Sequence, residues 1–472
     1  VSLKKLDTQS FTFGLESIHN NSRMTLQEDC YDTLETQQHI HQLWHKERNT
    51  LIARSFWSDA QKKEYALQHL SAVVDYAFNQ IPFYHDYYQA SGYETGALRS
   101  LTDFESIPVL NKNILRSVQT KDFLPRHLPE NAANIFWSST SGSSGVALPI
   151  LSDLDSVSFN SLTYYRMFQR LGGNAFSTDR WIYNVHHIRS WVSSLSGDYP
   201  TFTLNDIANI DEFILHLEHL RPILLNLLPS YLPLLEPYAC RIARLELKAI
   251  ITNSEASSLH EREYFSSLYQ TPVLDEYSSE EVGIIALECP FRHYHPEFDY
   301  IHVELKDLSS AGSSGLATVY CTDFMCRTMP FIRYDHGDIV SVAGNDSSLC
   351  KCGQHGRTIE RIDGRKDDCL KTLSGHYVPT AVVTNTLDSF FNADPNVSAF
   401  RLIQRATLTD FIFMYTGAST EQLSPALAAF QEQLQVLLKV SIHLKIERVD
   451  ALPDTPSYKR KKVISQAQEA AQ

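Results

Sequence analysis

The stretch TPVLDEYSSEEVGIIALEC, residues 271–289, joins a short apolar segment to an acidic turn and a cysteine. Residues 271–274 have the character of a short buried strand. Other strand-like and helix-like segments precede it: 181–183 and 249–251 as strands, and 156–171, 211–219 and 258–269 as helices. Alternation of this kind predicts an α/β domain with a largely parallel sheet.

The regions on either side of this segment have different patterns. Residues 34–57 and 59–79 show helical spacing, and the first 130 residues are predicted to be mostly helical. The chain becomes richer in strands from about residue 300. After residue 367 a separate unit is expected, with strands near 399–404, 410–415 and 441–448 and a helix over 420–438. We therefore expect a large multi-layer domain over residues 1–366 and a small α+β domain over residues 367–472.

Composition limits the class of protein. At 472 residues the chain is too long for one typical core. The net charge is −14 and no basic stripe offsets it, which argues against nucleic acid and anionic membranes as partners. The richest apolar run, residues 222–229, is too short to span a membrane, and the first residues do not resemble a signal peptide. A reducing, cytoplasmic location is expected, so the eight cysteines are predicted to be thiols or metal ligands.

The sequence CKCG, residues 350–353, places two thiols one residue apart between turn-forming residues. With Cys289 and either His293 or His295, the pair Cys350 and Cys352 could complete a tetrahedral zinc site. Four protein ligands leave no open position, so the predicted role is structural, in a zinc-binding insertion around residues 289–352. The alternative is that these cysteines are free thiols.

The run SSTSGSSG, residues 138–145, is rich in hydroxyls and glycines. A P-loop of the NTPase type would need a lysine after the last glycine, and Gly145 is instead followed by Val-Ala-Leu. Another kind of phosphate loop remains, in which hydroxyl and backbone N–H groups hold phosphates. The alternative is a flexible linker.

Three further motifs carry side chains suited to nucleotide chemistry. In DEYSSEE, residues 275–281, an aromatic ring precedes paired carboxylates that could bind Mg²⁺. In FIRYDHGDIV, residues 331–340, Asp338 could accept hydrogen bonds from ribose hydroxyls. In TPSYKRKKVIS, residues 455–465, a lysine could stabilise phosphate charge. Taken singly, each is also an ordinary turn or a solvated charged segment.

The order of these motifs resembles that of the adenylate-forming acyl-CoA synthetase superfamily, and most closely its phenylacetate–CoA ligase-like branch. The resemblance covers about residues 60–465 and rests on IPFYHDYY (81–88), IPVLNK (107–112), SSTSGSSG (138–145), NSE (253–255), YSSEEVGIIALEC (277–289), RYDHGD (333–338), CKCG (350–353) and GRKDD (364–368). It implies that residues 1–366 form an adenylation domain and that residues 367–472 form a mobile lid. It also implies a requirement for ATP and Mg²⁺.

The resemblance implies a role for each matching residue. The ATP phosphates would be held by Thr140, Ser141, Gly142, Ser143 and Ser144. Ser254 and Glu255 would border the adenine, on which Tyr277 would stack. Glu281 would bind Mg²⁺, and Asp338 would hold the ribose with Arg365 nearby. Asp367 would be the hinge and Lys459 the catalytic lysine, and the pattern ECP…H…E favours His295 as the fourth zinc ligand.

This chain departs from the family pattern at three places. The lysine often found after the phosphate loop is absent, as is common in this branch. Glu280 stands where many relatives carry Ser or Thr. Tyr458 stands where a glycine usually precedes the late lysine, so Lys461 is the alternative to Lys459.

The predicted substrate is a small cyclic or aromatic carboxylic acid, because aromatic residues are abundant around the expected pocket. The pocket would be lined by Trp181, Tyr183, His186 and His187, with Trp191 as a further candidate. The N-terminal extension and Glu280 resemble amide-forming members such as coronafacate ligase, which favours an amino-acid amine as acceptor. The alternatives are coenzyme A as acceptor, giving a thioester, and a non-catalytic scaffold that binds adenylate.

Overall fold

The structure is a computed structural model of the chain. It describes residues 25–28, 34–54, 57–127, 134–139, 148–164, 171, 182–185, 190–193, 209–308, 315–343, 348–366, 369–391, 396–453 and 461–467. Within these residues no helix is both long enough and apolar enough to cross a membrane.

The N-terminal region is helical, as predicted. It contains α2 (Leu34–Arg54), α3 (Asp59–Gln80), α4 (Pro82–Gln89), α5 (Leu101–Glu105), α6 (Lys112–Ser117) and the 3-10 helix η1 (Thr120–Phe123). A capping box between Ser58 and Gln61 starts α3, whose buried residues recur at helical spacing. Ile81 ends α3 and caps α4, so the proline at 82 starts a new helix at its first position.

A sheet of twelve strands forms the centre of the molecule. Its strands are β2 (Leu110–Asn111), β5 (Ile182–Val185), β6 (Ser190–Ser193), β7 (Leu224–Leu227), β8 (Ala249–Thr252), β9 (Val273–Ser279), β10 (Gly283–Glu288), β11 (Tyr294–Pro296), β12 (Ile301–Asp307), β13 (Leu316–Asp323), β14 (Tyr334–Ala343) and β15 (Thr358–Arg365). The order is β12-β13-β14-β15-β11-β10-β9-β8-β7-β5-β6, and β2 pairs with β14.

The prediction of a largely parallel sheet is confirmed for the strands in the middle of the chain, but the complete sheet is mixed. Neighbours are parallel along β5, β7, β8 and β9 and where β2 meets β14, whereas β9 to β15 and β6 pair antiparallel. Connections such as that between β9 and β10 are too short for the crossover that parallel neighbours need.

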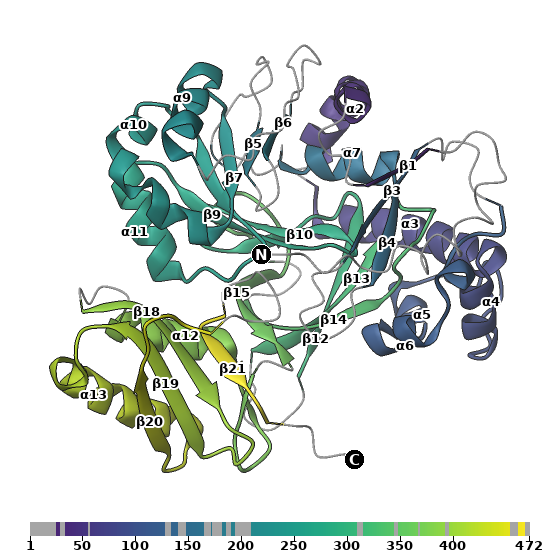
Figure 1. The fold of residues 1–472 in the computed structure, drawn as a ribbon. Helices are drawn as coiled ribbons and strands as arrows, with labels where there is room; N and C mark the ends of the chain where they lie inside the picture. Colours follow the sequence, from purple (N-terminus) through teal and green to yellow (C-terminus); the bar gives the residue numbers. More distant parts are fainter. Residues whose placement is uncertain are drawn as a thin grey trace.

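Helices cover both faces of the parallel strands. On one face α9 (Ile210–Leu220), α10 (Ala239–Ala243), α11 (Leu259–Tyr269) and the 3-10 helix η3 (Pro229–Tyr238) pack together, and Figure 1 shows the three α-helices on the same side of β7 and β9. On the other face α7 (Leu154–Leu162) and the N-terminal helices enclose the largest core. Alternate residues of each strand therefore enter different cores.

A small sheet flanks the segment predicted to hold phosphates. It has the order β1 (Thr25–Glu28), β3 (Asn134–Ser139) and β4 (Pro149–Asp153). The strands β3 and β4 form an antiparallel hairpin in which Ser139 pairs with Pro149. Residues 140–147, which connect them, lie outside the described residues.

The C-terminal region is a smaller α+β unit with a core of its own (Figure 1, olive to yellow). Its elements are β16 (Leu370–Lys371), β17 (Tyr377–Val378), α12 (Thr380–Phe391), β18 (Val397–Gln404), β19 (Asp410–Gly417), α13 (Thr420–Leu438), β20 (His443–Arg448) and β21 (Val463–Ser465). The predicted strands and the predicted helix over 420–438 are confirmed, while α12 and β21 were not predicted. The predicted fold class, a large multi-layer α/β unit with a small α+β unit, is confirmed; the boundary at residues 366 and 367 stays a prediction.

Candidate nucleotide and metal sites

Glu281 lies in the turn between β9 and β10, and its side chain is 6% exposed. The turn is held against α7, because Gly283 has a φ of +71° and a Cβ there would overlap Asn160. Tyr334 Oη donates a hydrogen bond to Glu281 Oε1 at 2.9 Å. Burial raises the pKa of Glu281, but nearby His336 and Lys112 outweigh it, so the pKa is lowered and the carboxylate stays charged.

Lys112 is a site residue to which the sequence analysis gave no role. Its Nζ lies 3.9 Å from Glu281 Oε1. The pairing of β2 with β14, in which Leu110 lies opposite Tyr334, brings the start of α6 to this place. Burial lowers the pKa of Lys112, and Glu281 opposes that shift. The only sequence signal was its position at the end of IPVLNK, one of the quoted motifs.

Asp338 contacts two other predicted nucleotide-binding residues. Tyr277 Oη donates to Asp338 Oδ2 at 2.7 Å, and Arg365 Nε lies 3.6 Å from Oδ1. Asp338 and Arg365 are direct partners across β14 and β15. Tyr277 is 5% exposed, and burial together with Asp338 raises its pKa far above the usual value. Its hydroxyl therefore stays protonated and orients the carboxylate.

His336 supplies evidence that this site can accept a ligand. Its Nε2 is buried and has no hydrogen-bond partner among the described residues, although its ring packs against Tyr334 with centroids 4.8 Å apart. Burial lowers the pKa of His336, and the nearby carboxylates of Asp338 and Glu281 oppose that shift. A buried polar atom without a partner is costly, and a bound group would remove that cost.

Ser254 and Glu255 lie in the loop that follows β8. Ser254 has a left-handed backbone, with a φ of 63°. Glu255 Oε2 accepts a hydrogen bond from the backbone N–H of Ser230 at 3.1 Å, at the start of η3. Because β7, β8 and β9 are parallel, this loop and Tyr277 lie at the same end of the sheet, where α/β sheets bind ligands.

Several predicted site residues lie outside the described residues: Thr140, Ser141, Gly142, Ser143, Ser144, Trp181, His186, His187, Asp367 and Lys459. The backbone of Trp191 is in β6, but its side chain is not described. Tyr183 is fully buried in the core beneath α9, with its ring 5.5 Å from that of Phe213, which favours a core role over the predicted contact with substrate. Lys461 precedes β21, and its backbone carbonyl accepts a hydrogen bond from Arg401.

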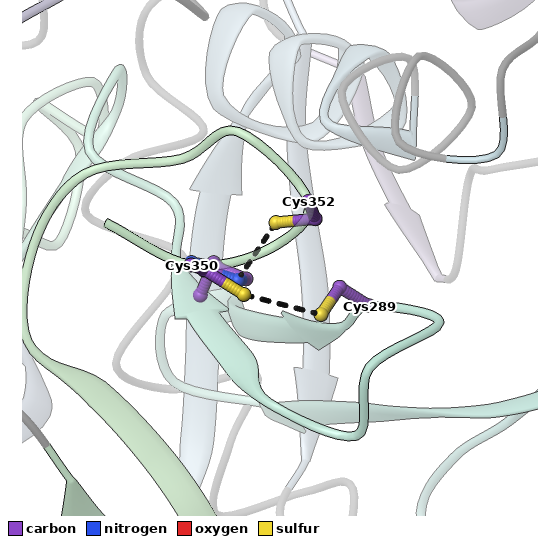
Figure 2. Close-up of side chains that lie close together, drawn as sticks. Cys289, Cys350 and Cys352 are labelled. Atoms are coloured by element: carbon purple, nitrogen blue, oxygen red, sulfur yellow. Dashed lines mark hydrogen bonds between the residues drawn. The ribbon is translucent and has the colours of Figure 1, made fainter. Parts of the chain in front are cut away.

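The structure brings together the residues predicted to bind zinc. The ligand atoms of Cys289, His295, Cys350 and Cys352 all lie within 4.8 Å of one another. Cys289 Sγ is 3.9 Å from Cys350 Sγ, and Cys352 Sγ is 3.2 Å from His295 Nε2 (Figure 2). Tetrahedral zinc with Zn–S bonds of about 2.3 Å needs ligand sulfurs about 3.8 Å apart, so the donor set fits. His293 approaches only through Nδ1, which lies 3.4 Å from Cys350 Sγ.

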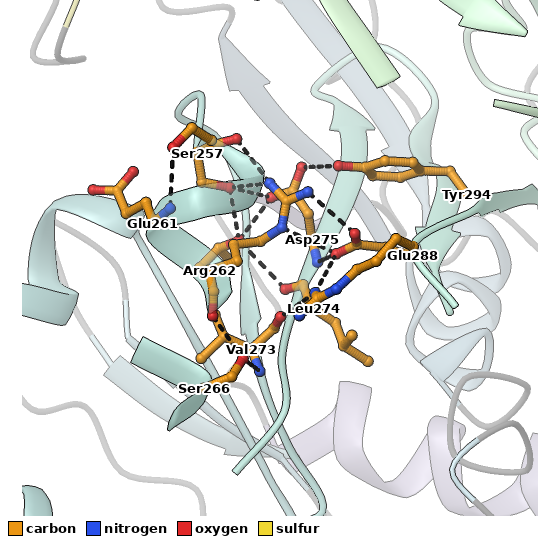
Figure 3. Close-up of polar contacts among 12 residues, drawn as sticks. Ser257, Glu261, Arg262, Ser266, Val273, Leu274, Asp275, Glu288 and Tyr294 are labelled. Carbon is orange, nitrogen blue, oxygen red and sulfur yellow. Dashed lines mark hydrogen bonds and ion pairs between the residues drawn. The ribbon is translucent and has the colours of Figure 1, made fainter. Parts of the chain in front are cut away.

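A buried polar network lies beside the metal-ligand cluster (Figure 3). Arg262 of α11 contacts both carboxylate oxygens of Glu288 at 3.1 Å. Glu288 Oε2 also accepts a hydrogen bond from the backbone N–H of Asp275 at 2.9 Å, and Tyr294 Oη donates to Asp275 Oδ2 at 2.8 Å. Glu288 and Tyr294 directly precede Cys289 and a second ligand, so the network holds two of the four ligands in place.

Known structures share this fold. No family model and no curated protein matches the sequence. Two crystal structures of 2-hydroxyisobutyryl-CoA ligase in the postadenylation state, in complex with R3-HIB-AMP and with 2-HIB-AMP, are 18% identical, with TM-scores of 0.66 and 0.64 over 88% of this chain and 91% of theirs. The same ligase in its thioesterification state gives a TM-score of 0.52 over 88% of this chain and 92% of that one. At this identity the likeness establishes the fold.

Proposed function

We propose that this chain uses magnesium–ATP to convert a carboxylic acid into an acyl-adenylate and then passes the acyl group to an acceptor. The observation that supports this most is the convergence of Glu281, Lys112, Tyr277, Asp338 and Arg365 at one site. These residues come from motifs that are far apart in the sequence. The fold that carries them resembles that of a ligase solved with an acyl-AMP.

The chemistry explains why such a site needs its charges. A carboxylate oxygen of the acid attacks the α-phosphorus of ATP, the bond to the β-phosphate oxygen breaks, and pyrophosphate leaves. The acceptor then attacks the acyl carbon, and AMP leaves. Negative charge gathers on the phosphates in the first step, so fixed cations and hydrogen-bond donors lower the barrier.

Each described residue has a proposed role. Glu281 would hold Mg²⁺, which supplies charge neutralisation when bound. Lys112 would place a positive charge beside that ion and the phosphates. Asp338, oriented by Tyr277 and Arg365, would accept hydrogen bonds from the ribose hydroxyls. The adenine stacking predicted for Tyr277 and the border formed by Ser254 and Glu255 remain proposals.

The rest of the proposed machinery rests on the sequence. Thr140, Ser141, Gly142, Ser143 and Ser144 would hold the phosphates, Asp367 would be the hinge, and Lys459 or Lys461 would reach the α-phosphate. The small C-terminal unit would act as the lid. Cys289, His295, Cys350 and Cys352 would hold a structural zinc ion, for which the grouping of their donor atoms is the support.

Two acceptors are proposed for the acyl group. An amino-acid amine follows from the sequence resemblance and would give an amide. Coenzyme A is favoured by the structural neighbour, a CoA ligase that was also solved with CoA in an open conformation. This chain is similar to that structure with a TM-score of 0.59 and 18% identity, over 87% of this chain and 93% of that one. The acid itself is proposed to be small, with a cyclic or aromatic acid favoured by the sequence.

The test is ATP–pyrophosphate exchange with a panel of carboxylic acids, followed by mass spectrometry of the products formed with CoA or with amino acids. We expect exchange with at least one acid and a thioester or an amide as the final product. Exchange with no acid, together with tight binding of AMP, would instead favour the non-catalytic scaffold.

A further inference from the structure

Polar side chains end four neighbouring parallel strands on one face of the central sheet. They are Asn184 on β5, Asn226 on β7, Asn253 just after β8 and Glu276 on β9. The strand register aligns them. Asn184 pairs with Asn226. Asn226 in turn pairs with Ile251, and Ile251 pairs with Leu274. Asn253 lies two residues after Ile251, and Glu276 lies two residues after Leu274. Side chains two apart on a strand share a face, so all four members, here called the polar row, face the same way.

Three of the four members of the polar row are buried, and Asn253 is partly buried. Asn184, Asn226 and Glu276 are 7%, 5% and 8% exposed. Earlier residues of the same strands on this face, such as Leu224 and Leu274, belong to the apolar core. A change from apolar to polar side chains at the carboxyl ends of parallel strands is where open α/β sheets bind ligands. Burial of three polar groups is costly unless they are paired or serve a ligand.

Hydrogen bonds connect Asn226, Asn253 and Glu276, three members of the row, through Tyr164. Tyr164, which follows α7, donates its hydroxyl to Glu276 Oε2. Asn226 Nδ2 donates to Tyr164 Oη at 2.6 Å, and Asn253 Nδ2 donates to Asn226 Oδ1. These three members therefore form a connected network that ends at a carboxyl group.

Glu276 has no basic partner in the described part of the chain. The titratable groups that act on it are Tyr164, Asp275 and Tyr300, and none of them is cationic. Burial raises the pKa of Glu276 to about 7. By contrast, the buried Glu288 on the same hairpin contacts two arginines.

We propose that the polar row binds an ammonium group on the acid to be adenylated, so that the substrate is an amino-bearing carboxylic acid whose nitrogen pairs with Glu276. This inference rests on the proposed function. Glu276 directly precedes Tyr277, which holds Asp338, so the row adjoins the candidate nucleotide site. A substrate cation supplies the charge partner that the protein lacks there, while Asn184, Asn226 and Asn253 add hydrogen bonds.

The experiment is ATP–pyrophosphate exchange with matched sets of acids. Each set shares one carbon skeleton, aliphatic or aromatic, and its members differ only in carrying an ammonium, a hydroxyl or a methyl group. We expect the ammonium member of at least one set to exceed both others in kcat/KM by about tenfold or more, since a pocket with a buried polar group rejects analogues that leave that group unpaired. In Glu276→Gln that preference is expected to disappear.

The pH profile gives a second readout that does not depend on a variant. For the ammonium acid, kcat/KM is expected to rise through about pH 7 as Glu276 ionises, and the ratio to the hydroxyl acid is expected to rise with it. Glu236→Gln, an exposed exchange of the same kind on η3, is the matched control and should keep the preference.

The outcomes distinguish a failure of the proposed function from a failure of this inference. Exchange with no acid contradicts the proposed function and this inference together. Exchange that favours the hydroxyl or methyl members, or an ammonium preference that survives in Glu276→Gln, overturns the inference and leaves adenylation supported.

Discussion

The strand β10 has a buried glutamate near each end, and the two are held in different ways. Glu288 ends the strand, is 0% exposed, and lies 3.1 Å from Arg262 Nε and 3.4 Å from Arg292 Nη1. Glu281 precedes the strand, is 6% exposed, and has Lys112 at 3.9 Å. One hairpin thus carries two different carboxylates. Glu288 is in close contact with two arginines, whereas the lysine nearest to Glu281 stays beyond hydrogen-bond distance.

The difference between the two ends indicates different roles. A carboxylate that accepts hydrogen bonds from arginines has used both its charge and its lone pairs within the protein. A carboxylate with a hydrogen-bonded tyrosine and a lysine beyond hydrogen-bond distance can still coordinate a hard cation. We therefore propose that Glu288 contributes to the stability of the fold and that Glu281 contributes to the reaction. The variants below each change one of these two ends of the strand.

The largest effect is expected from the metal ligands beside Glu288. The double variant Cys350→Ser with Cys352→Ser should lose its zinc and about 5 kcal/mol or more of stability, since the binding energy of a structural metal is folding energy. Metal analysis and chemical denaturation measure both. Cys240→Ser, at an exposed thiol on α10, should keep both at the native level. A purified native chain that holds no zinc would contradict the assignment.

Arg262→Met tests the Glu288 end directly. Removal of one partner leaves a buried charge and should cost about 3–5 kcal/mol of unfolding free energy. Arg241→Met is the matched control, because Arg241 pairs with Glu218 at 2.7 Å but on the surface, where solvent screens the pair and its contribution to stability is small. Equal losses of unfolding free energy in Arg262→Met and Arg241→Met would contradict a special role of the buried pair in stability.

Glu281→Gln tests the other end. Pyrophosphate exchange should fall about 100- to 1,000-fold, because the amide cannot replace a charged ligand of the metal, while the unfolding free energy should change little. The neighbouring Glu280→Gln provides the control, since Glu280 is exposed and should change exchange by no more than about threefold. Exchange at the native rate in Glu281→Gln would end the assignment of this residue.

Lys112→Met should lower exchange by about 30-fold, which corresponds to about 2 kcal/mol of lost transition-state stabilisation. Lys112→Arg keeps the positive charge and should recover part of that rate. If Lys112 acts only by packing, the two variants will lose activity to the same extent, and single-turnover rates at saturating ATP will separate these cases.

The smallest effect is a pH dependence at a third glutamate of the hairpin. Glu276 has its pKa raised from 4.5 to about 7, so the folded chain keeps a proton that the unfolded chain loses. Its contribution to stability is complete below about pH 4.5 and is lost as the pH rises towards 7, by about 2 kcal/mol between pH 5 and pH 7.5. Glu276→Gln should remove this decline, as denaturation at both pH values would measure. Parallel pH curves for the two proteins would show that the carboxyl titrates normally.

The sequence predicted best those features that depend on neighbours along the chain. The spacing of apolar residues located α2, α3 and, in the C-terminal unit, α13 with the strands β18, β19 and β20, because amphipathic periodicity is a local property. Three cysteine ligands and either His293 or His295 were also identified from the sequence, because few arrangements of Cys and His satisfy a tetrahedral site, and the family resemblance favoured His295.

Features that depend on contacts between distant segments were missed. Nothing local to Lys112 indicates that a two-residue strand will pair with β14 and carry it to Glu281, 169 positions away. The polar row was missed for the same reason, since each asparagine is ordinary on its own strand and gains meaning only from the register of its neighbours. The mixed pairing of the sheet could not be read from segments whose partners are set by tertiary packing.

The short pairing of β2 with β14 makes the first hundred or so residues more than a covering for the core. It places the positive charge of Lys112, at the start of α6, beside Glu281 in the site formed by later parts of the chain. Two fragments separated between η1 and β3 would divide the ionic partners between them, so neither piece would hold a complete centre. The two fragments could be tested separately and mixed. Turnover only in the mixture would show that the N-terminal helices contribute a residue that the site needs.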